Sequence, residues 1–273
     1  MKKIGILFLG LISAFSFSQN TRFVYQVSMK TDSTAAPKIE NAYLDISTEK
    51  SIFYGEKRMK RDSTIRQAME TRNFNFDRNS MEQFRTAITY SIEKNHATKT
   101  ISYKDRIARD QYWYDEDRTF NWKILPETVK IGEYETQKAE TTFAGRKWFA
   151  WFTQDLPFID GPYKFSGLPG LIVKVEDEKG DYSFDLKETK KIAELPNFES
   201  RFGNNIKVKR SEFLKQQEKF NKDPMLFFQN QGGGFAMRMG GNQNPQNEAE
   251  RRKMMEERLK EEAKANNNPL EKN

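Results

Sequence analysis

The side chains in this sequence best suited to do chemistry are acidic residues near an aromatic strand. Five aspartates lie between positions 155 and 185: Asp155, Asp160, Asp177, Asp181 and Asp185. Two carboxylates in one pocket can act as acid and base, or as acid and nucleophile, in hydrolysis. The chain has 39 acidic residues, however, and no spacing singles out a pair. Hydrolysis of glycans or peptides by an Asp/Glu pair is therefore our alternative hypothesis, and we assign no catalytic residue.

Other catalytic and metal chemistries have few suitable residues. His96 is the only histidine and the chain has no cysteine, which excludes a two-histidine zinc site, a thiol nucleophile and disulfides. His96 stands in a polar turn, where a solvated side chain is the default. Asp177, Glu178 and Asp181 lack the spacing of an EF-hand loop. We expect no metal and no cofactor.

A run of aromatic residues, 146–152, offers a binding surface instead. Alternation along a strand places Trp148 and Phe152 on one face and Phe149 and Trp151 on the other. Core packing is the plainer interpretation of these rings. If one face lines an open sheet, its rings could stack on sugars, peptides or lipids while Arg146 holds an anionic group. We take Arg146, Trp148, Trp151 and Tyr163 as the ligand-binding candidates.

The elements that would position these residues are mainly strands. From Thr21 to about Leu186 apolar residues alternate, and β-branched and aromatic types are frequent. Segments 139–143 and 147–153 flank a short turn at 144–146 and predict a hairpin. The expected fold is mainly β, an antiparallel meander that forms a curved sheet or open barrel. Residues 55–80 are charged and poorly periodic, and predict a loop or a region to which the pattern assigns no element.

The hexapeptide 167–172 is the most distinctive run of the chain. It reads Gly167, Leu168, Pro169, Gly170, Leu171 and Ile172. Proline at the second and glycine at the third position of a turn predict a type II turn. The apolar residues that follow predict a strand buried on both faces at its start.

On this hexapeptide the sequence resembles the GLPGLI family, exported proteins of Bacteroidota with no established activity. Further residues occur in the family order: Gln137–Ala139, Gly145, Arg146, Trp148, Ala150, Trp151, Asp160–Tyr163 and Asn268–Glu271. A weaker similarity is to the N-terminal bowl-like domain of some bacterial peptide N-glycosidases. It implies a β-rich accessory module without glycosidase chemistry.

The N-terminus is typical of a secretory signal peptide. Lys2 and Lys3 precede the apolar stretch 4–17, and small residues at 16 and 18 predict cleavage before Gln19. We therefore expect residues 1–18 to be removed and the mature chain to be periplasmic or secreted, and soluble.

The C-terminal part changes in composition. Residues 211–222 predict a helix capped by Ser211 and packed on the sheet, which closes a β-rich domain at 19–228. Gln, Asn, Gly and Met predominate at 229–247, as in a flexible linker, and 248–273 predict a charged helical tail.

The charge pattern constrains the partners. The 46 basic and 39 acidic residues are interleaved, which indicates a mixed surface rather than a nucleic-acid site. The leading hypothesis is a non-enzymatic envelope protein that binds a glycan, peptide or lipid ligand, or a partner such as an outer-membrane protein or transporter. A purely structural role in an envelope assembly is the other alternative.

Overall fold

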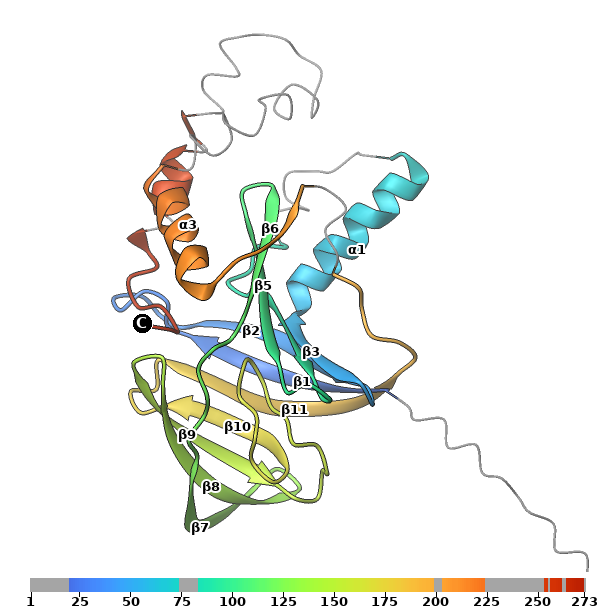
Figure 1. Ribbon diagram of the computed structural model, residues 1–273, viewed down its shortest axis with the longest axis vertical. Helices are drawn as coiled ribbons and strands as arrows, with labels where there is room; N and C mark the ends of the chain where they lie inside the picture. Colours follow the sequence, from blue (N-terminus) through green and yellow to red (C-terminus); the bar gives the residue numbers. More distant parts are fainter. Residues whose placement is uncertain are drawn as a thin grey trace, which may run out of the picture.

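The computed structural model describes residues 20–73, 83–198, 203–223, 253–254, 256–261 and 264–272. Within them, 12 strands form one curved, open and mostly antiparallel sheet (Figure 1). The first half contains β1 (Asn20–Met29), β2 (Lys38–Ile46), β3 (Lys50–Gly55), β4 (Ser91–Asn95), β5 (Ile101–Ile107) and β6 (Asp110–Asp115). The second contains β7 (Lys123–Ile131), β8 (Tyr134–Phe143), β9 (Arg146–Thr153), β10 (Leu171–Asp177), β11 (Tyr182–Ile192) and β12 (Asn205–Lys207). The prediction of a mainly β, antiparallel fold is confirmed.

The sheet consists of two meanders joined along a central pair. Its strand order is β12-β6-β5-β4-β3-β2-β1-β11-β10-β9-β8-β7. Neighbours in sequence therefore pair within β1–β6 and within β7–β11. The pairing of β1 with β11, from Asn20 with Ile192 to Met29 with Tyr182, unites the two halves. Beyond β6, the short β12 pairs in parallel.

Strand alternation explains how the sheet forms its core. In β1 the side chains of Phe23, Tyr25, Val27 and Met29 are buried, as their period of two predicts. The connection 154–170 between β9 and β10 packs onto the same core, where Phe165 is fully buried and lies 4.8 Å from the Trp148 ring. This connection covers the face of the sheet on which Trp148 lies.

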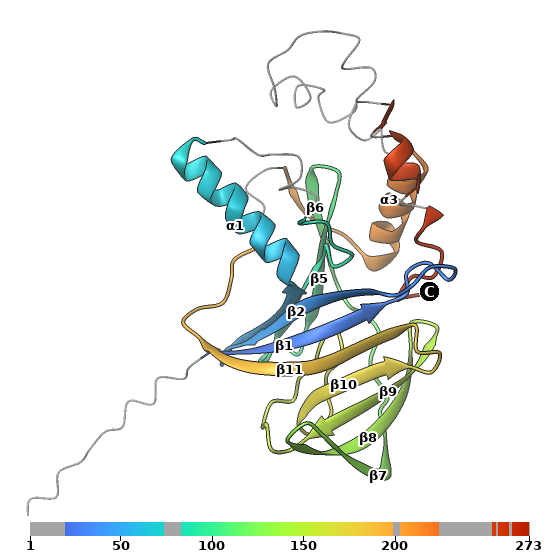
Figure 2. The ribbon, with the colours of Figure 1, turned by 180° about the vertical axis from the view of Figure 1, so that it is seen from behind.

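Two helices stand beside the β5–β6 hairpin (Figures 1 and 2). Helix α3 (Arg210–Lys222) confirms the predicted C-terminal helix, although its N-cap is Lys209 and not Ser211. Helix α1 (Glu56–Thr71) occupies the segment predicted as a loop, so that prediction was wrong. Its apolar residues have no helical period, and ion pairs four residues apart support it instead, for example Lys60 with Glu56.

One strand and one turn have irregular local geometry. Strand β7 continues past Pro126 through a register shift between Ile124 and Thr128, because an edge strand tolerates a proline at an irregularity. In the hexapeptide, Gly170 N donates to Leu168 O at 2.8 Å, which closes a three-residue turn rather than the predicted type II turn.

The close approach of two backbones explains that turn. Gly170 has φ +144°, and a Cβ there would lie 2.0 Å from the Thr153 carbonyl oxygen. The expectation for the strand that follows is met, since Leu171, Ile172 and Val173 are all fully buried.

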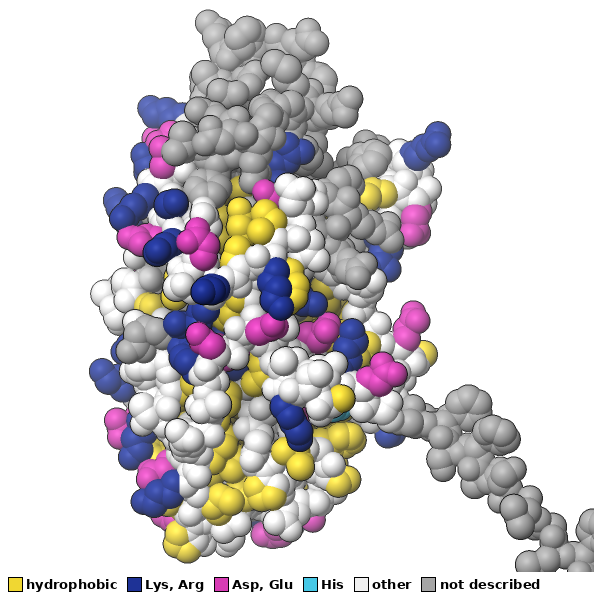
Figure 3. Space-filling view, viewed as in Figure 1, with side chains coloured by type: hydrophobic (Ala, Val, Ile, Leu, Met, Phe, Trp, Pro, Cys, Tyr) yellow, Lys and Arg dark blue, Asp and Glu magenta, His cyan; other side chains and the backbone are white. Residues whose placement is uncertain are grey.

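The predicted signal peptide 1–18 and linker 229–247 lie outside the described residues. Of the predicted tail, 253–254 and 256–261 are helical. Residues 265–272 have no regular secondary structure, and they form hydrogen bonds with Thr31 and Ala144. Basic and acidic side chains are interleaved over the face in Figure 3. Among the described residues, no helix is long and apolar enough to cross a membrane.

Candidate functional site

The C-terminal residues 264–272, which we call the tail segment, bind along the body of the protein. Asn268 N donates to Thr31 O at 2.8 Å, and Lys272 N donates to Ala144 O at 2.9 Å. Between these two anchors, Leu270 packs against the main hydrophobic core. Residues 268–272 of the tail segment are thus held by a backbone hydrogen bond at each end and by apolar contact between them.

Arg146 is the main contact to the middle of the tail segment, residues 268–270. It begins β9 directly after a two-residue turn whose Ala144 and Gly145 both have positive φ (51° and 75°), as in the tight hairpin turns. Its side chain is 2% exposed. Nη2 donates to Asn268 Oδ1 at 2.7 Å and to Pro269 O at 2.8 Å, and Nε donates to Leu270 O at 3.0 Å.

Two aspartates and a tyrosine fix the Arg146 side chain. Nη1 donates to Asp177 Oδ2 at 2.7 Å and to Asp181 Oδ2 at 3.3 Å. The guanidinium carbon lies 4.7 Å from the centre of the Tyr182 ring, within cation–π range. Arg146, Asp177, Asp181 and Tyr182 form what we call the Arg146 cluster.

The Arg146 cluster and Lys30, the residue after β1, together favour an asparagine at position 268. The Asn268 side chain accepts a hydrogen bond from Arg146 and donates one from Nδ2 to Lys30 O at 2.7 Å. Tyr182 OH also donates to the Asn268 carbonyl oxygen at 2.6 Å. An aspartate at position 268 would lack the donor that Lys30 O requires.

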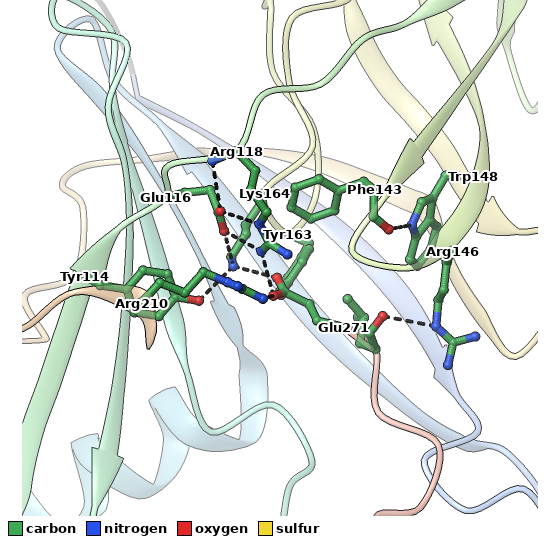
Figure 4. A network of polar contacts seen from close by, with 11 residues as sticks. Tyr114, Glu116, Arg118, Phe143, Arg146, Trp148, Tyr163, Lys164, Arg210 and Glu271 are labelled. Atoms are coloured by element: carbon green, nitrogen blue, oxygen red, sulfur yellow. Dashed lines mark hydrogen bonds and ion pairs between the residues drawn. The ribbon is translucent and has the colours of Figure 1, made fainter. Parts of the chain in front are cut away.

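Lys164 forms the centre of a second cluster, at the other end of the tail segment (Figure 4). Its side chain is fully buried. Nζ donates to Glu116 Oε2 at 2.6 Å, to Glu271 Oε1 at 2.5 Å and to Tyr114 OH at 2.9 Å. These three bonds use all three ammonium protons. Tyr163 OH donates to the same Glu271 oxygen at 2.5 Å.

Arg118 and Arg210 complete this arrangement, and with Tyr114, Glu116, Tyr163 and Lys164 they form the Lys164 cluster. Arg118 donates to both Glu116 oxygens, at 2.7 and 2.8 Å, and to Glu271 Oε2 at 2.7 Å. Arg210 Nη2 lies 3.4 Å from the same Glu271 oxygen. Figure 4 shows these basic side chains converging on the Glu271 carboxylate.

The electrostatics favour an ionised carboxylate at this position. Burial alone would raise the pKa of Glu116, but Arg118 and Lys164 lower that pKa to about 2. Burial likewise opposes ionisation of Glu271, yet Lys164 and its other partners hold the pKa below its ordinary value. Without Glu271, the side chains of Lys164, Arg118 and Arg210 would lose a carboxylate that they share. The Lys164 cluster is therefore built to accept an anionic side chain.

The sequence-derived ligand-binding candidates divide between this site and two other places. Arg146 and Tyr163 both contact the tail segment. Trp148 is fully buried, and its Nε1 donates to Phe143 O at 3.1 Å. Trp151 is half-buried on the opposite face of the sheet, where Lys138 and Lys174 lie over its ring. The structure thus brings together Arg146 and Tyr163, but not the two tryptophans.

Sequence reasoning missed the charged residues that surround Glu271. Arg118 and Lys164, which bind Glu271, and Glu116, which shares these two partners, lie in segments without a recognisable motif. Two signals were available: Lys164 stands inside the apolar run after Asp160, and Asn268–Glu271 matches a family ending. Neither signal indicates that these segments meet.

The aspartates considered for hydrolysis have other surroundings. Asp155 is exposed, and Asp185 accepts a hydrogen bond from Ser183. Asp160 is buried beside Lys94, with Nζ and Oδ1 2.6 Å apart. Asp177 and Asp181 belong to the Arg146 cluster. Within the described part of the chain, no group of three or more histidines, cysteines or acidic residues is arranged to hold a metal ion.

Comparison with known proteins supports the fold and leaves the activity open. Residues 141–174 match the model of a family described as "Protein of unknown function (Porph_ging)". This range contains Arg146, Tyr163, Lys164 and the hexapeptide. No curated protein matches. Membership of the GLPGLI family remains a prediction.

Two structures of PNGF-II, in space groups P21 and C2, have a similar fold. The first shares 19% identity at a TM-score of 0.51, and the second 17% at 0.52. Each similarity covers 72% of this chain, but 33% and 32% of the respective PNGF-II chains. The chain therefore spans about a third of the length of PNGF-II, and the likeness is one of fold. At the level of the fold, it supports the weaker resemblance to a β-rich domain of peptide N-glycosidases.

Proposed function

We propose that this protein is a non-enzymatic binding module of the cell envelope, whose ligand is an extended peptide segment with an asparagine and a glutamate. In the structure its own tail segment occupies the site. The observation that carries the proposal is the burial of the Glu271 carboxylate among Lys164, Arg118 and Tyr163. The export of the chain and an outer-membrane partner are parts of this proposal that rest on sequence alone.

The contacts are typical of peptide recognition. Arg146 and Tyr182 bind three successive carbonyl groups, those of residues 268, 269 and 270, and such main-chain bonds hold a segment in an extended form. The side chains of Asn268 and Glu271 then select the sequence. Leu270 supplies the apolar contact between them.

A peptide-binding titration tests the proposal. The acceptor is the full chain with Asn268→Ala and Glu271→Gln, which weaken its own tail segment. The probe is a fluorescent peptide with the sequence of residues 264–272. We expect saturable binding by anisotropy, with a Glu271→Gln peptide binding at least about ten-fold more weakly because the charge-assisted bonds are lost. A peptide with Lys272→Ala, an exposed position, is the matched control and should bind normally.

Two further measurements make this titration decisive. Hydrogen exchange at the amide of Lys272 reports whether the acceptor's own tail segment has left the site. The unsubstituted chain should bind the peptide much more weakly, because its attached tail segment competes at an effective concentration in the millimolar range. Equal affinity for the native and Glu271→Gln peptides, or no binding to an open acceptor, would contradict the proposal.

The hydrolase hypothesis is favoured only by the likeness of fold to PNGF-II. It predicts release of a glycan or peptide product when the protein is incubated with an N-glycosylated peptide. Products that disappear in a Glu116→Gln or Asp177→Asn variant that remains folded would favour it. Unchanged substrate after prolonged incubation would leave the binding function as the better account.

A further inference from the structure

The binding site fits the sequence of its own tail segment at successive positions. Asn267 Oδ1 accepts from Ser33 N at 2.9 Å, and its Nδ2 donates to Asp32 Oδ1 at 3.0 Å. The contacts of Asn268 to Lys272 follow without a break. The ligand best matched to this site is therefore a segment that every copy of the chain carries.

The tail segment makes these contacts far in sequence from its partners. The bond of Arg146 to Asn268 spans 122 positions, and that of Lys164 to Glu271 spans 107. Asp32 and Asn267 are 235 positions apart. Because the partners lie in the β-sheet and its connections, the contacts themselves do not depend on which copy supplies the tail segment.

The connecting chain is long enough for either arrangement. Residues 224–252 lie between α3 and the C-terminal residues of the structure. A chain of this length can span at most about 100 Å. A fold of about 200 residues has a radius of gyration of only about 16 Å. Covalent connection therefore does not confine the tail segment to its own body.

We propose that the tail segment of one copy also binds the site of a second copy, and that two copies exchange tails reciprocally. This inference rests on the proposed function, because it requires the site to accept the segment as a separate ligand. The exchanged pair has the same contacts as two separate copies, so exchange has a low thermodynamic cost. Binding within one chain has the advantage of an effective concentration in the millimolar range. Exchanged pairs should therefore accumulate as the protein concentration approaches that range.

Disulfide cross-linking tests the exchange directly, since the chain has no native cysteine. Ser33 and Asn267 are exposed neighbours across the contact. Ser33→Cys chains are mixed with Asn267→Cys chains at roughly 1 mM, a concentration chosen to match the effective concentration. We expect the mixed dimer under mild oxidation to exceed each same-variant dimer about five-fold or more, beyond the random ratio. Glu271→Gln in the Asn267→Cys chain should remove this excess.

Two controls separate failure of the exchange from failure of the site. Glu135→Cys, an exposed position eight residues along β8 from Phe143, replaces Ser33→Cys and should give no excess. A chain with both Ser33→Cys and Asn267→Cys should form the bond internally at micromolar concentration, which checks the geometry. If that bond forms while the mixed dimer stays at the Glu135→Cys level, the exchange is refuted and the binding function stands. If the internal bond fails and the peptide also fails to bind, the proposed function itself is refuted.

Discussion

The Glu271→Gln substitution probes the central ion pairs of the site. Lys164 is fully buried and the Glu271 side chain is 15% exposed. Removing one partner from a buried ion pair costs about 3–5 kcal/mol. Here Lys164 and Arg118 both keep Glu116, and glutamine retains one acceptor oxygen. We therefore expect the loss to lie nearer 2–3 kcal/mol, on the scale of a hydrogen bond to a charged group.

Native-state hydrogen exchange measures this loss where it occurs. The amides of Asn268 and Lys272 donate to the body of the protein, so their protection reports the free energy of releasing the tail segment. A loss of 2–3 kcal/mol corresponds to exchange about 30- to 150-fold faster. Amides of the central β1–β11 pair should change far less, because the sheet stays folded.

A matched substitution controls for the lost charge. Glu261 lies in the same C-terminal region and is exposed, so Glu261→Gln removes the same charge without breaking the cluster. It should leave exchange at Asn268 and Lys272 unchanged within about two-fold, as expected for an exposed position. If Glu271→Gln behaves like Glu261→Gln, the Lys164 cluster does not hold the tail segment and the reasoning is wrong.

Two other perturbations test the fold around the site. Gly170→Ala should lower the free energy of unfolding, measured in denaturant, by about 3 kcal/mol or more, because its Cβ would meet the Thr153 carbonyl. The control is Gly167→Ala, which has open space around it and should lower that free energy by about 1 kcal/mol. Equal losses in the two variants would contradict the close approach at Gly170. The carboxylate of Asp160, whose Oδ2 lies 3.9 Å from His96 Nε2, raises the pKa of His96 above its ordinary value. The stabilisation from this ion pair is therefore present below about pH 6.5 and is lost as the pH rises through the folded-state pKa. The free energy of unfolding should fall over that rise, and His96→Gln should flatten the dependence; an unchanged pH profile in the variant would exclude this role.

Local sequence patterns were sufficient for much of the sheet. Alternation identified β1 and the β8–β9 hairpin, and it correctly separated Trp148 from Trp151 onto opposite faces. It could not decide which face is packed, because the connection 154–170 covers the Trp148 side. Helix α1 escaped detection because helix prediction depends on apolar period, whereas this helix is charged on most sides and buries only Arg58 and Ala68.

The amino-acid sequence supplies the residue types of the site: an arginine at the start of an aromatic strand, a tyrosine and a lysine in an apolar run, and an asparagine and a glutamate near the end. It favoured Arg146 for binding because a guanidinium suits an anionic group, and Tyr163 was a further candidate. In the folded chain Arg146 instead binds Asn268 and two backbone carbonyl groups, and the carboxylate of Glu271 lies beside Tyr163 and Lys164. The bond between Lys164 and Glu271 joins residues 107 positions apart, and such a pairing is set by the curvature of the whole sheet. Patterns of period two or 3.6 report which side of one element is buried and carry no information about distant partners.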